Sequence, residues 1–179
     1  MVFSFVNQAD FDVQRDIAQW SQVAAELLNS AQILPTQEPI RIRIQLNAAL
    51  ISTISDDILF EPESFRGVRD LAGNLQAAAI VINREDHLYL NYIATAPWNI
   101  TRNSPRSVRN AATALVVELV KESMRNGCKG RIIADAVSGS SSFYERIGFV
   151  RTGFGSDAAP EMELTSETAS LLLRRRRNT

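Results

Sequence analysis

The alternation of apolar and polar positions divides the chain into a helical first third and a remainder rich in strands. After Asp10, apolar residues recur every three or four positions as far as Leu28, which predicts an amphipathic helix with Asp10 as its N-cap. The stretch from Ile40 to Ile54 fits an alternating strand at its start and a helical face over its whole length, and we favour a helix. We therefore expect residues 1–60 to be helical.

Three consecutive strands are predicted after Ser64. Phe65–Arg69 and Leu75–Ile82 flank a run of turn-forming residues, as the two arms of an antiparallel hairpin do. His87–Ala96 is a further β run, and Pro97 ends it because proline has no N–H to donate to a neighbouring strand. The three strands should form a meander.

Helices and strands then alternate to the end of the chain. The predicted elements are a turn-rich connection at 98–106, a helix at 108–125, a strand at 131–137, a short helix at 139–147, two strands at 149–154 and 161–164, and a helix or frayed tail at 166–177. Asn126-Gly127 is the stop signal of the long helix, because glycine adopts the left-handed conformation that follows many helices. The order β-β-β-α-β-α-β-β implies an α/β fold whose mixed sheet has a right-handed β-α-β crossover at its centre.

The composition fits one globular domain in a reducing compartment. With 179 residues and 45% hydrophobic content, we expect a single domain over residues 1–165 and a C-terminal helix or tail over 166–179. The single cysteine, Cys128, excludes an intrachain disulfide, and with one histidine it argues against a zinc site. The chain lacks the basic start of a signal peptide, and no apolar run approaches the ~18 residues of a membrane span, so we expect a cytoplasmic protein without a membrane partner.

The charge balance gives no general reason to expect a nucleic-acid partner. Lys and Arg number 19 against 20 Asp and Glu, for a formal net charge of −1. Arg174–Arg177 form a basic run, and without these four charges the rest of the chain carries −5. We expect this run to be a solvated tail, with binding to nucleic acid or to an acidic partner as the alternative.

The most informative motif lies near the C-terminus. Phe143-Tyr144-Glu145-Arg146-Ile147-Gly148-Phe149 follows a predicted strand and precedes a closing hairpin. It resembles the aromatic-Tyr-x-x-x-Gly-Phe signature of the GCN5-related N-acetyltransferase (GNAT) family. The resemblance extends to Ala96-Pro97-Trp98-Asn99 and to Asn126-Gly127-Cys128-Lys129-Gly130-Arg131, so it covers about the last 100 residues. Residues 1–60 match only in their helical character.

The resemblance implies a twisted mixed sheet of about six or seven strands with helices on both faces. It also implies direct transfer of an acetyl group from acetyl-CoA, as acyl donor, to a primary amine of a small molecule or peptide, with no metal. Residues 1–60 would then form the acceptor side. Tyr144 stands where the family commonly places the general acid that protonates the coenzyme A sulfur. The alternative is that Tyr144 is a half-buried aromatic that packs on the sheet.

In the family geometry, two neighbouring parallel strands splay apart where the coenzyme binds. Here these would be the strand that ends at Pro97 and the strand that begins at Arg131. Backbone groups of Ile93, Ala94 and Thr95 would then be unpaired, free to bind pantetheine and to polarise the thioester oxygen.

The pyrophosphate of the coenzyme should meet the loop that enters the long helix, because unpaired N–H groups and the helix dipole attract anions there. The family pattern, Gln or Arg followed by x-x-Gly-x-Gly or Ala, keeps only its last small residue in this chain. It falls on Ser107, Val108, Arg109, Asn110, Ala111 and Ala112. Asn110 replaces the first glycine, and Asn tolerates left-handed backbone angles better than other side chains. Arg106 and Arg109, and less strongly Arg102, are candidate phosphate ligands, with a solvated helix entrance as the alternative.

The serines ahead of Tyr144 are candidates for two roles. One of Ser138, Ser140, Ser141 and Ser142 should cap the short helix. Ser141 is also a candidate coenzyme contact, while Val137 stands where the family often has an asparagine.

No general base stands out in the sequence. The polar strand residues that could face a cleft are His87, Asn91, Asp135, Glu161 and Glu163, and many enzymes of this family deprotonate the amine through water. Cys128 is expected to pack rather than to react. Trp98 is expected to cover the sheet edge, with stacking over the substrate or adenine as the alternative.

Two other functions stay open. The first is a catalytically degenerate relative that binds the coenzyme as a sensor or interaction module, which the missing glycines favour. The second is a structural or nucleic-acid-associated protein that works through Arg174–Arg177. The sequence identifies neither the amine acceptor nor the oligomeric state, a homodimer included.

Overall fold

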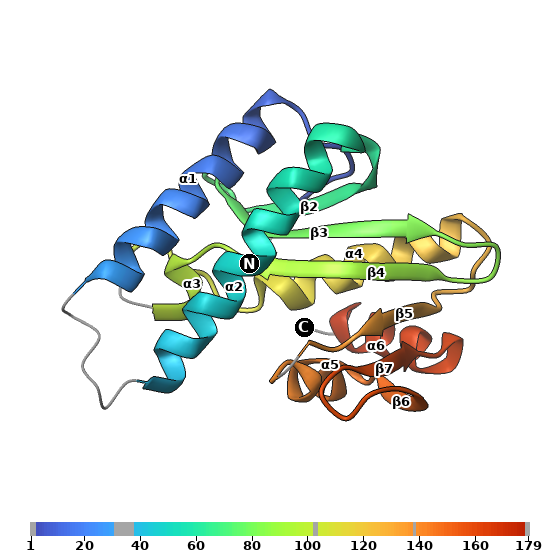
Figure 1. The fold of residues 1–179 in the computed structure, drawn as a ribbon. Helices are drawn as coiled ribbons and strands as arrows, with labels where there is room; N and C mark the ends of the chain where they lie inside the picture. The colour runs from blue at the N-terminus through green and yellow to red at the C-terminus, as the bar shows by residue number, and fades with distance from the viewer. Residues whose placement is uncertain (1–2, 31–37, 102–103, 138, 178–179) are drawn as a thin grey trace. The chain divides into compact units, whose positions relative to one another are not determined.

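The computed structural model describes residues 3–30, 38–101, 104–137 and 139–177. Within these residues the chain is a mixed α/β protein with one seven-stranded sheet (Figure 1). The helices are α1 (Phe11–Asn29), α2 (Glu38–Phe60), α3 (Trp98–Thr101), α4 (Ala111–Arg125), α5 (Ser141–Ile147) and α6 (Ser166–Arg177), with a 3-10 turn at Pro62–Ser64. The strands are β1 (Ser4–Val6), β2 (Phe65–Arg69), β3 (Leu75–Asn83), β4 (Leu88–Thr95), β5 (Ile132–Asp135), β6 (Val150–Gly155) and β7 (Pro160–Leu164).

The strand order is β1-β2-β3-β4-β5-β7-β6, which confirms the predicted mixed sheet. β4 and β5 run parallel, and α4 lies between them in sequence, so this pair is the predicted central crossover. The pairs β1–β2, β2–β3, β5–β7 and β6–β7 are antiparallel.

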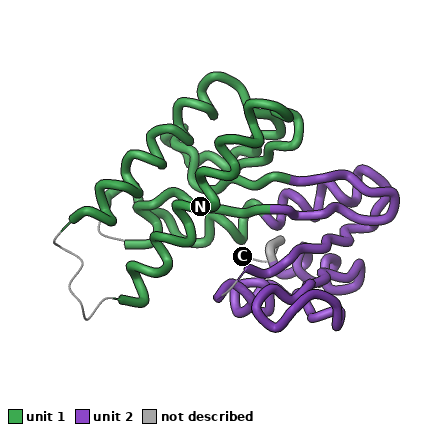
Figure 2. The backbone as a smooth tube through the Cα atoms, in the orientation of Figure 1, with its two compact units in different colours: residues 1–80, 92–115 green, residues 81–91, 116–179 purple. Residues whose placement is uncertain are grey.

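The chain divides into two compact units (Figure 2). The first unit comprises residues 1–80 and 92–115, and the second comprises residues 81–91 and 116–179. β3, β4 and α4 each contribute residues to both units.

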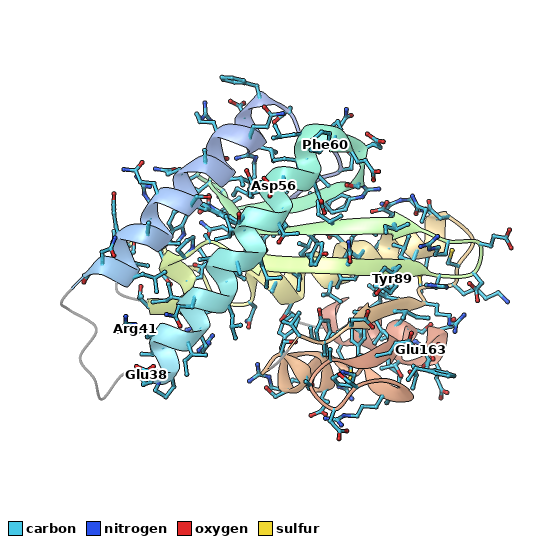
Figure 3. All side chains as sticks on the ribbon, viewed as in Figure 1. Glu38, Arg41, Asp56, Phe60, Tyr89 and Glu163 are labelled. Carbon is cyan, nitrogen blue, oxygen red and sulfur yellow. The ribbon has the colours of Figure 1, made fainter. Side chains whose placement is uncertain are left out.

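In the first unit, α1 and α2 bury their apolar faces in one core with β2, β3 and the end of β4. The Oδ1 atom of Asp10 accepts a hydrogen bond from the Val13 N–H at 2.9 Å, which confirms the predicted N-cap of α1. The helical interpretation of Ile40–Ile54 is confirmed too. α2 runs from Glu38 to Phe60, two residues labelled in Figure 3. The core consists of Ala9, Val13, Ile17, Trp20, Ile51, Ile54, Ile58, Phe65, Leu75, Ala78, Ile80, Ala94, Ala96 and Trp98.

Three local predictions for this unit were wrong. Residues 1–60 are not purely helical, because β1 pairs with β2, with Phe5 opposite Val68. The connection after Pro97 contains the short helix α3. Trp98 does not cover an open edge: it is buried, and its ring lies edge-on to Trp20 with 6.3 Å between ring centroids.

In the second unit, β5 lies between the first residues of β4 and β7. Gly127 has a φ of +84° and follows α4, as predicted. Gly148, the glycine of the C-terminal motif, ends α5 with a φ of +114°, and a Cβ atom there would lie 2.6 Å from Cγ2 of Thr168 on α6. Any other residue at position 148 would therefore have a strained backbone, and its Cβ atom would clash with Thr168. The basic run belongs to α6, which extends to Arg177. In the part of the chain described, no helix is both long and apolar enough to cross a bilayer.

Candidate active site

Between two paired positions, the segment that contains β4 has one residue more than the segment of β3 opposite it. At the turn between these strands, the Arg84 N–H donates to the His87 carbonyl at 3.0 Å. At the other end, the Ala96 N–H donates to the Gln76 carbonyl at 3.1 Å. The chain advances eight residues from Gln76 to Arg84 and nine from His87 to Ala96. One extra residue opposite a regular strand is a β-bulge.

The position of the bulge follows from the pairing of β4 with β5. That register is unbroken from Leu88 to Leu90, opposite Ile132 to Ala134, and β4 runs on to Thr95. The bulge therefore lies within residues 91–95. This segment includes Ile93, Ala94 and Thr95, the residues for which unpaired backbone groups were expected.

Thr95 does not have free backbone groups. Its N–H donates to Oδ1 of Asn47 at 3.1 Å, and its carbonyl accepts a hydrogen bond from Nδ2 of Asn47 at 2.9 Å. Asn47 lies on α2, so one side-chain amide supplies the acceptor and the donor that a neighbouring strand would supply. The expectation that an unpaired Thr95 N–H polarises a thioester is not met in this conformation. Ile93 and Ala94 remain the candidates in the bulged segment.

Replacing Asn47 by alanine tests the strength of this contact. The change leaves both backbone groups of Thr95 without a partner, so we expect the free energy of unfolding to fall by roughly 1–3 kcal/mol. Urea denaturation measures the difference. Asn126→Ala is the matched control, because Asn126 donates to Oδ1 of Asn83 at an exposed site, 3.0 Å away. An equal, small change in both variants would show that the Asn47 contact does not hold α2 to β4.

The loop that enters α4 has the backbone conformation expected from its sequence. Asn110 has a φ of +64°, in the left-handed region that a glycine would favour. Its carbonyl accepts the first hydrogen bond of the helix, from the Ala114 N–H at 2.8 Å. α4 therefore begins at Ala111, three residues after the predicted start at Val108.

The N–H groups of this loop fall into two sets. The first set is already paired: Arg106 N–H donates to the Ser104 hydroxyl (3.2 Å), Ser107 N–H to the Ser104 carbonyl (2.9 Å) and Val108 N–H to Oδ1 of Asn99 (2.8 Å). The second set comprises residues 109–113, whose N–H groups donate to no other residue that the structure describes. These groups stand at the start of a 15-residue helix, so the residues present fit an anionic phosphate group.

The two arginines of the loop differ in their contacts. The guanidinium carbon of Arg106 lies 5.8 Å from the centroid of the Trp98 ring, a cation–π arrangement. Arg109 is exposed, immediately beside the free N–H groups. Arg109 is thus the better placed of the two to meet a phosphate. Arg102, the third candidate, lies outside the described residues.

Tyr144 lies on α5 in the second unit and is only 4% exposed. Its ring meets Phe143 and Phe149 edge-on, with 5.2 Å between centroids in each pair. Burial raises the pKa of the Tyr144 phenol well above its ordinary value, and the negative charge of Asp135 and then Tyr89 add to the shift. A tyrosine phenol is protonated at neutral pH, and the raised pKa makes this one a weaker acid than usual. The two aromatic contacts agree with the packing role as well as with the acid role.

A serine stands at the N-cap of α5, as predicted, but its side chain makes no capping hydrogen bond. Ser140 occupies the N-cap position but makes no capping hydrogen bond, because its hydroxyl donates to the Val137 carbonyl at 2.7 Å. Ser141 is the first residue of α5 and is half-buried. Ser138 lies outside the described residues.

Two of the candidate bases belong to an ion-pair network in the second unit. Nδ1 of His87 lies 2.7 Å from the Asp86 carboxylate, and Arg131 bridges Asp86 and Glu163. The Nε atom of Arg131 lies 2.6 Å from the carboxylate of Glu163, which is labelled in Figure 3. The hydrogen bond from His87 and the charge of Arg131 lower the pKa of Asp86.

Asp135 and Glu161 are also held by neighbours, whereas Asn91 is a half-buried residue of β4. Asp135 accepts a hydrogen bond from the Tyr89 hydroxyl at 2.5 Å, and Glu161 accepts one from Thr152 at 2.7 Å. Cys128 is buried, with its Sγ atom 3.7 Å from the Arg84 carbonyl. No side chain in the described part of the chain stands out as a general base. In that part, no three His, Cys, Asp or Glu side chains gather as metal ligands do.

Comparison with solved structures establishes the fold. PaiA N-acetyltransferase from Thermoplasma acidophilum, solved in complex with coenzyme A, is similar over 91% of this chain and 98% of its own, with a TM-score of 0.54 and 13% identity. Ard1 from Thermoplasma volcanium (92% and 97%, TM-score 0.52, 15% identity) and a GNAT-family acetyltransferase from Listeria monocytogenes (90% and 94%, TM-score 0.52, 14% identity) are similar too. The sequence matches no protein-family model and no curated protein. The chain therefore has the fold of the GCN5-related N-acetyltransferases, as its motifs predicted.

Proposed function

We propose, from this fold, that the protein transfers an acetyl group from acetyl-CoA directly to a primary amine of a small molecule or peptide. The observation that carries the proposal is the entrance of α4. Asn110 adopts the left-handed conformation in the place of the family's glycine, and the N–H groups of residues 109–113, which have no partner among the described residues, could receive the pyrophosphate of the coenzyme. Arg109 adds a positive charge beside them.

Acetyl-CoA, when bound, supplies an activated acetyl group and a thiolate leaving group. The amine nitrogen forms its bond to the acetyl carbon, the bond from carbon to sulfur breaks, and the amine loses a proton to water. In this proposal, backbone groups of the bulged segment at Ile93 and Ala94 bind pantetheine, and Ser141 contacts the coenzyme. Tyr144 gives its proton to the departing thiolate. A tyrosine phenol is protonated at neutral pH, so it has this proton to give.

A second candidate is a catalytically silent protein that binds the coenzyme as a sensor. One observation favours it: the Thr95 N–H, which was expected to polarise the thioester, is bonded to Asn47. Such a protein would keep the anion-binding entrance of α4 and would lack acetyl transfer. The two candidates share coenzyme binding and differ only in turnover.

Calorimetry followed by a thiol-release assay tests both candidates. We expect the full chain to bind acetyl-CoA and coenzyme A, and to release thiol only when amines are added. Binding without any amine-dependent thiol release would exclude the acetyltransferase and support the sensor. The absence of detectable binding up to millimolar coenzyme would exclude both.

A further inference from the structure

Gln76 is a completely buried amide in the first unit, with an exposed fraction of 0%. Its Oε1 atom accepts hydrogen bonds from Trp98 Nε1 at 3.2 Å and from Asn99 Nδ2 at 3.0 Å. Its Nε2 atom donates to the Asp70 carboxylate at 2.7 Å and to the Arg106 carbonyl at 3.3 Å. Both polar atoms of the side chain are therefore paired. A buried network whose members are all satisfied fixes one geometry, because any other arrangement leaves a polar group unpaired.

Asn99 extends this network to the loop ahead of α4. Its Nδ2 also donates to the Gln76 carbonyl at 3.2 Å, and its Oδ1 accepts the Val108 N–H at 2.8 Å. The loop is thus held at two points, the carbonyl of Arg106 and the N–H of Val108. Asn110, with its left-handed backbone, follows two residues after Val108.

We infer that Gln76 and Asn99 are positioning residues for the coenzyme's pyrophosphate. Neither side chain is needed to touch the ligand. They hold residues 106–108 so that the free N–H groups of residues 109–113 are already in place before an anion arrives. Fixing a loop beforehand increases affinity, because less conformational entropy is lost on binding. The inference rests on the proposed coenzyme binding, and it explains how an anion site can persist where the family's glycines are missing.

Asn99→Ala tests this inference by removing the acceptor of the Val108 N–H. We expect kcat/KM for acetyl-CoA to fall about tenfold, as the loss of a net hydrogen bond to a preorganised loop would give. For S-acetylpantetheine, which lacks the pyrophosphate and the nucleotide, we expect a change of less than about twofold. A purely structural role for Asn99 would lower both values alike. Asn126→Ala serves as the control, because it removes an asparagine side-chain contact outside this network.

Each outcome separates the inference from the proposed function. If the wild-type chain fails to bind coenzyme A, the proposed function is wrong and the inference with it. If the wild type binds coenzyme A but Asn99→Ala lowers kcat/KM equally for both acyl donors, or for neither, only the inference is wrong. If the wild type binds without turnover, the dissociation constants of coenzyme A and pantetheine replace the kinetic values. Should Asn99→Ala not fold, as judged by circular dichroism, Asn99→Ser carries the same comparison.

Discussion

Replacing Tyr144 by phenylalanine is expected to lower kcat roughly 10²- to 10⁴-fold, the usual contribution of a general acid. The ring keeps its edge-on contacts with Phe143 and Phe149, so only the proton donor is lost. Steady-state kinetics with acetyl-CoA and a responsive amine measure the change. KM for acetyl-CoA should stay nearly constant, because the phenol acts on the departing sulfur.

The control for this variant is Tyr92→Phe, which removes a hydroxyl from a half-buried tyrosine of β4. We expect its kcat to stay close to that of the wild type. A kcat within about threefold of the wild type in Tyr144→Phe would show that Tyr144 only packs against the sheet.

The raised pKa of Tyr144 also sets the direction of an effect of pH on stability. The folded pKa lies above the unfolded value of about 10. The stabilisation linked to it is therefore complete below about pH 10 and is lost as the pH rises toward the folded pKa. Tyr144→Phe has no such proton, so its stability should fall less steeply than that of the wild type above pH ~10. Urea denaturation at several alkaline pH values compares the two.

Trp20→Ala is expected to lower the free energy of unfolding by about 3–5 kcal/mol. The Trp20 side chain is fully buried between α1 and the rest of the first core, where its ring meets Trp98 at an interplanar angle of 88°. Alanine would leave a cavity that the packed core cannot close. Phe60→Ala, at the exposed end of α2, should change stability by less than about 0.5 kcal/mol. A loss below about 1 kcal/mol for Trp20→Ala would mean that the core repacks around the missing ring.

Trp20→Phe is a more sensitive version of the same experiment. Nε1 of Trp20 is a buried polar atom without a hydrogen-bond partner among the described residues. Phenylalanine removes this unpaired N–H together with part of the ring. We therefore expect a clearly smaller loss than for alanine, because relief of the desolvation cost offsets some of the lost packing.

Much of the fold could be predicted because its elements bury periodic apolar faces. Asp10 and the spacing of Val13, Ile17 and Trp20 define α1, and Gly127 marks the end of α4. β1 was missed because a strand of three residues has no measurable period and depends on its pairing with β2. α4 was predicted to start too early because the apolar pattern reaches Val108, whereas the Val108 N–H is bonded to Asn99.

The candidate site was only partly predictable, for a related reason. Tyr144 and Asn110 belong to local motifs, so sequence order alone locates them. Asn47 acts through a contact with a residue that lies 48 positions away in the sequence. The partners of Gln76 lie 22 and 23 positions away. An amide on a helix or strand carries no signal of such a partner. A half-buried asparagine on α2 would have been a clue only if the helix and its face had already been known.

The bulge in β4 absorbs one residue of that strand's length. Because the bulge accommodates the extra residue, Ala96, just after β4, still pairs with Gln76 of β3. Deleting a single residue between 91 and 95 would restore regular alternation and leave Ala96 opposite Gln76, so the side chains that follow would keep their faces. Such a deletion would therefore remove the irregular backbone at Ile93 and Ala94 while it keeps the pairing of β3 with β4.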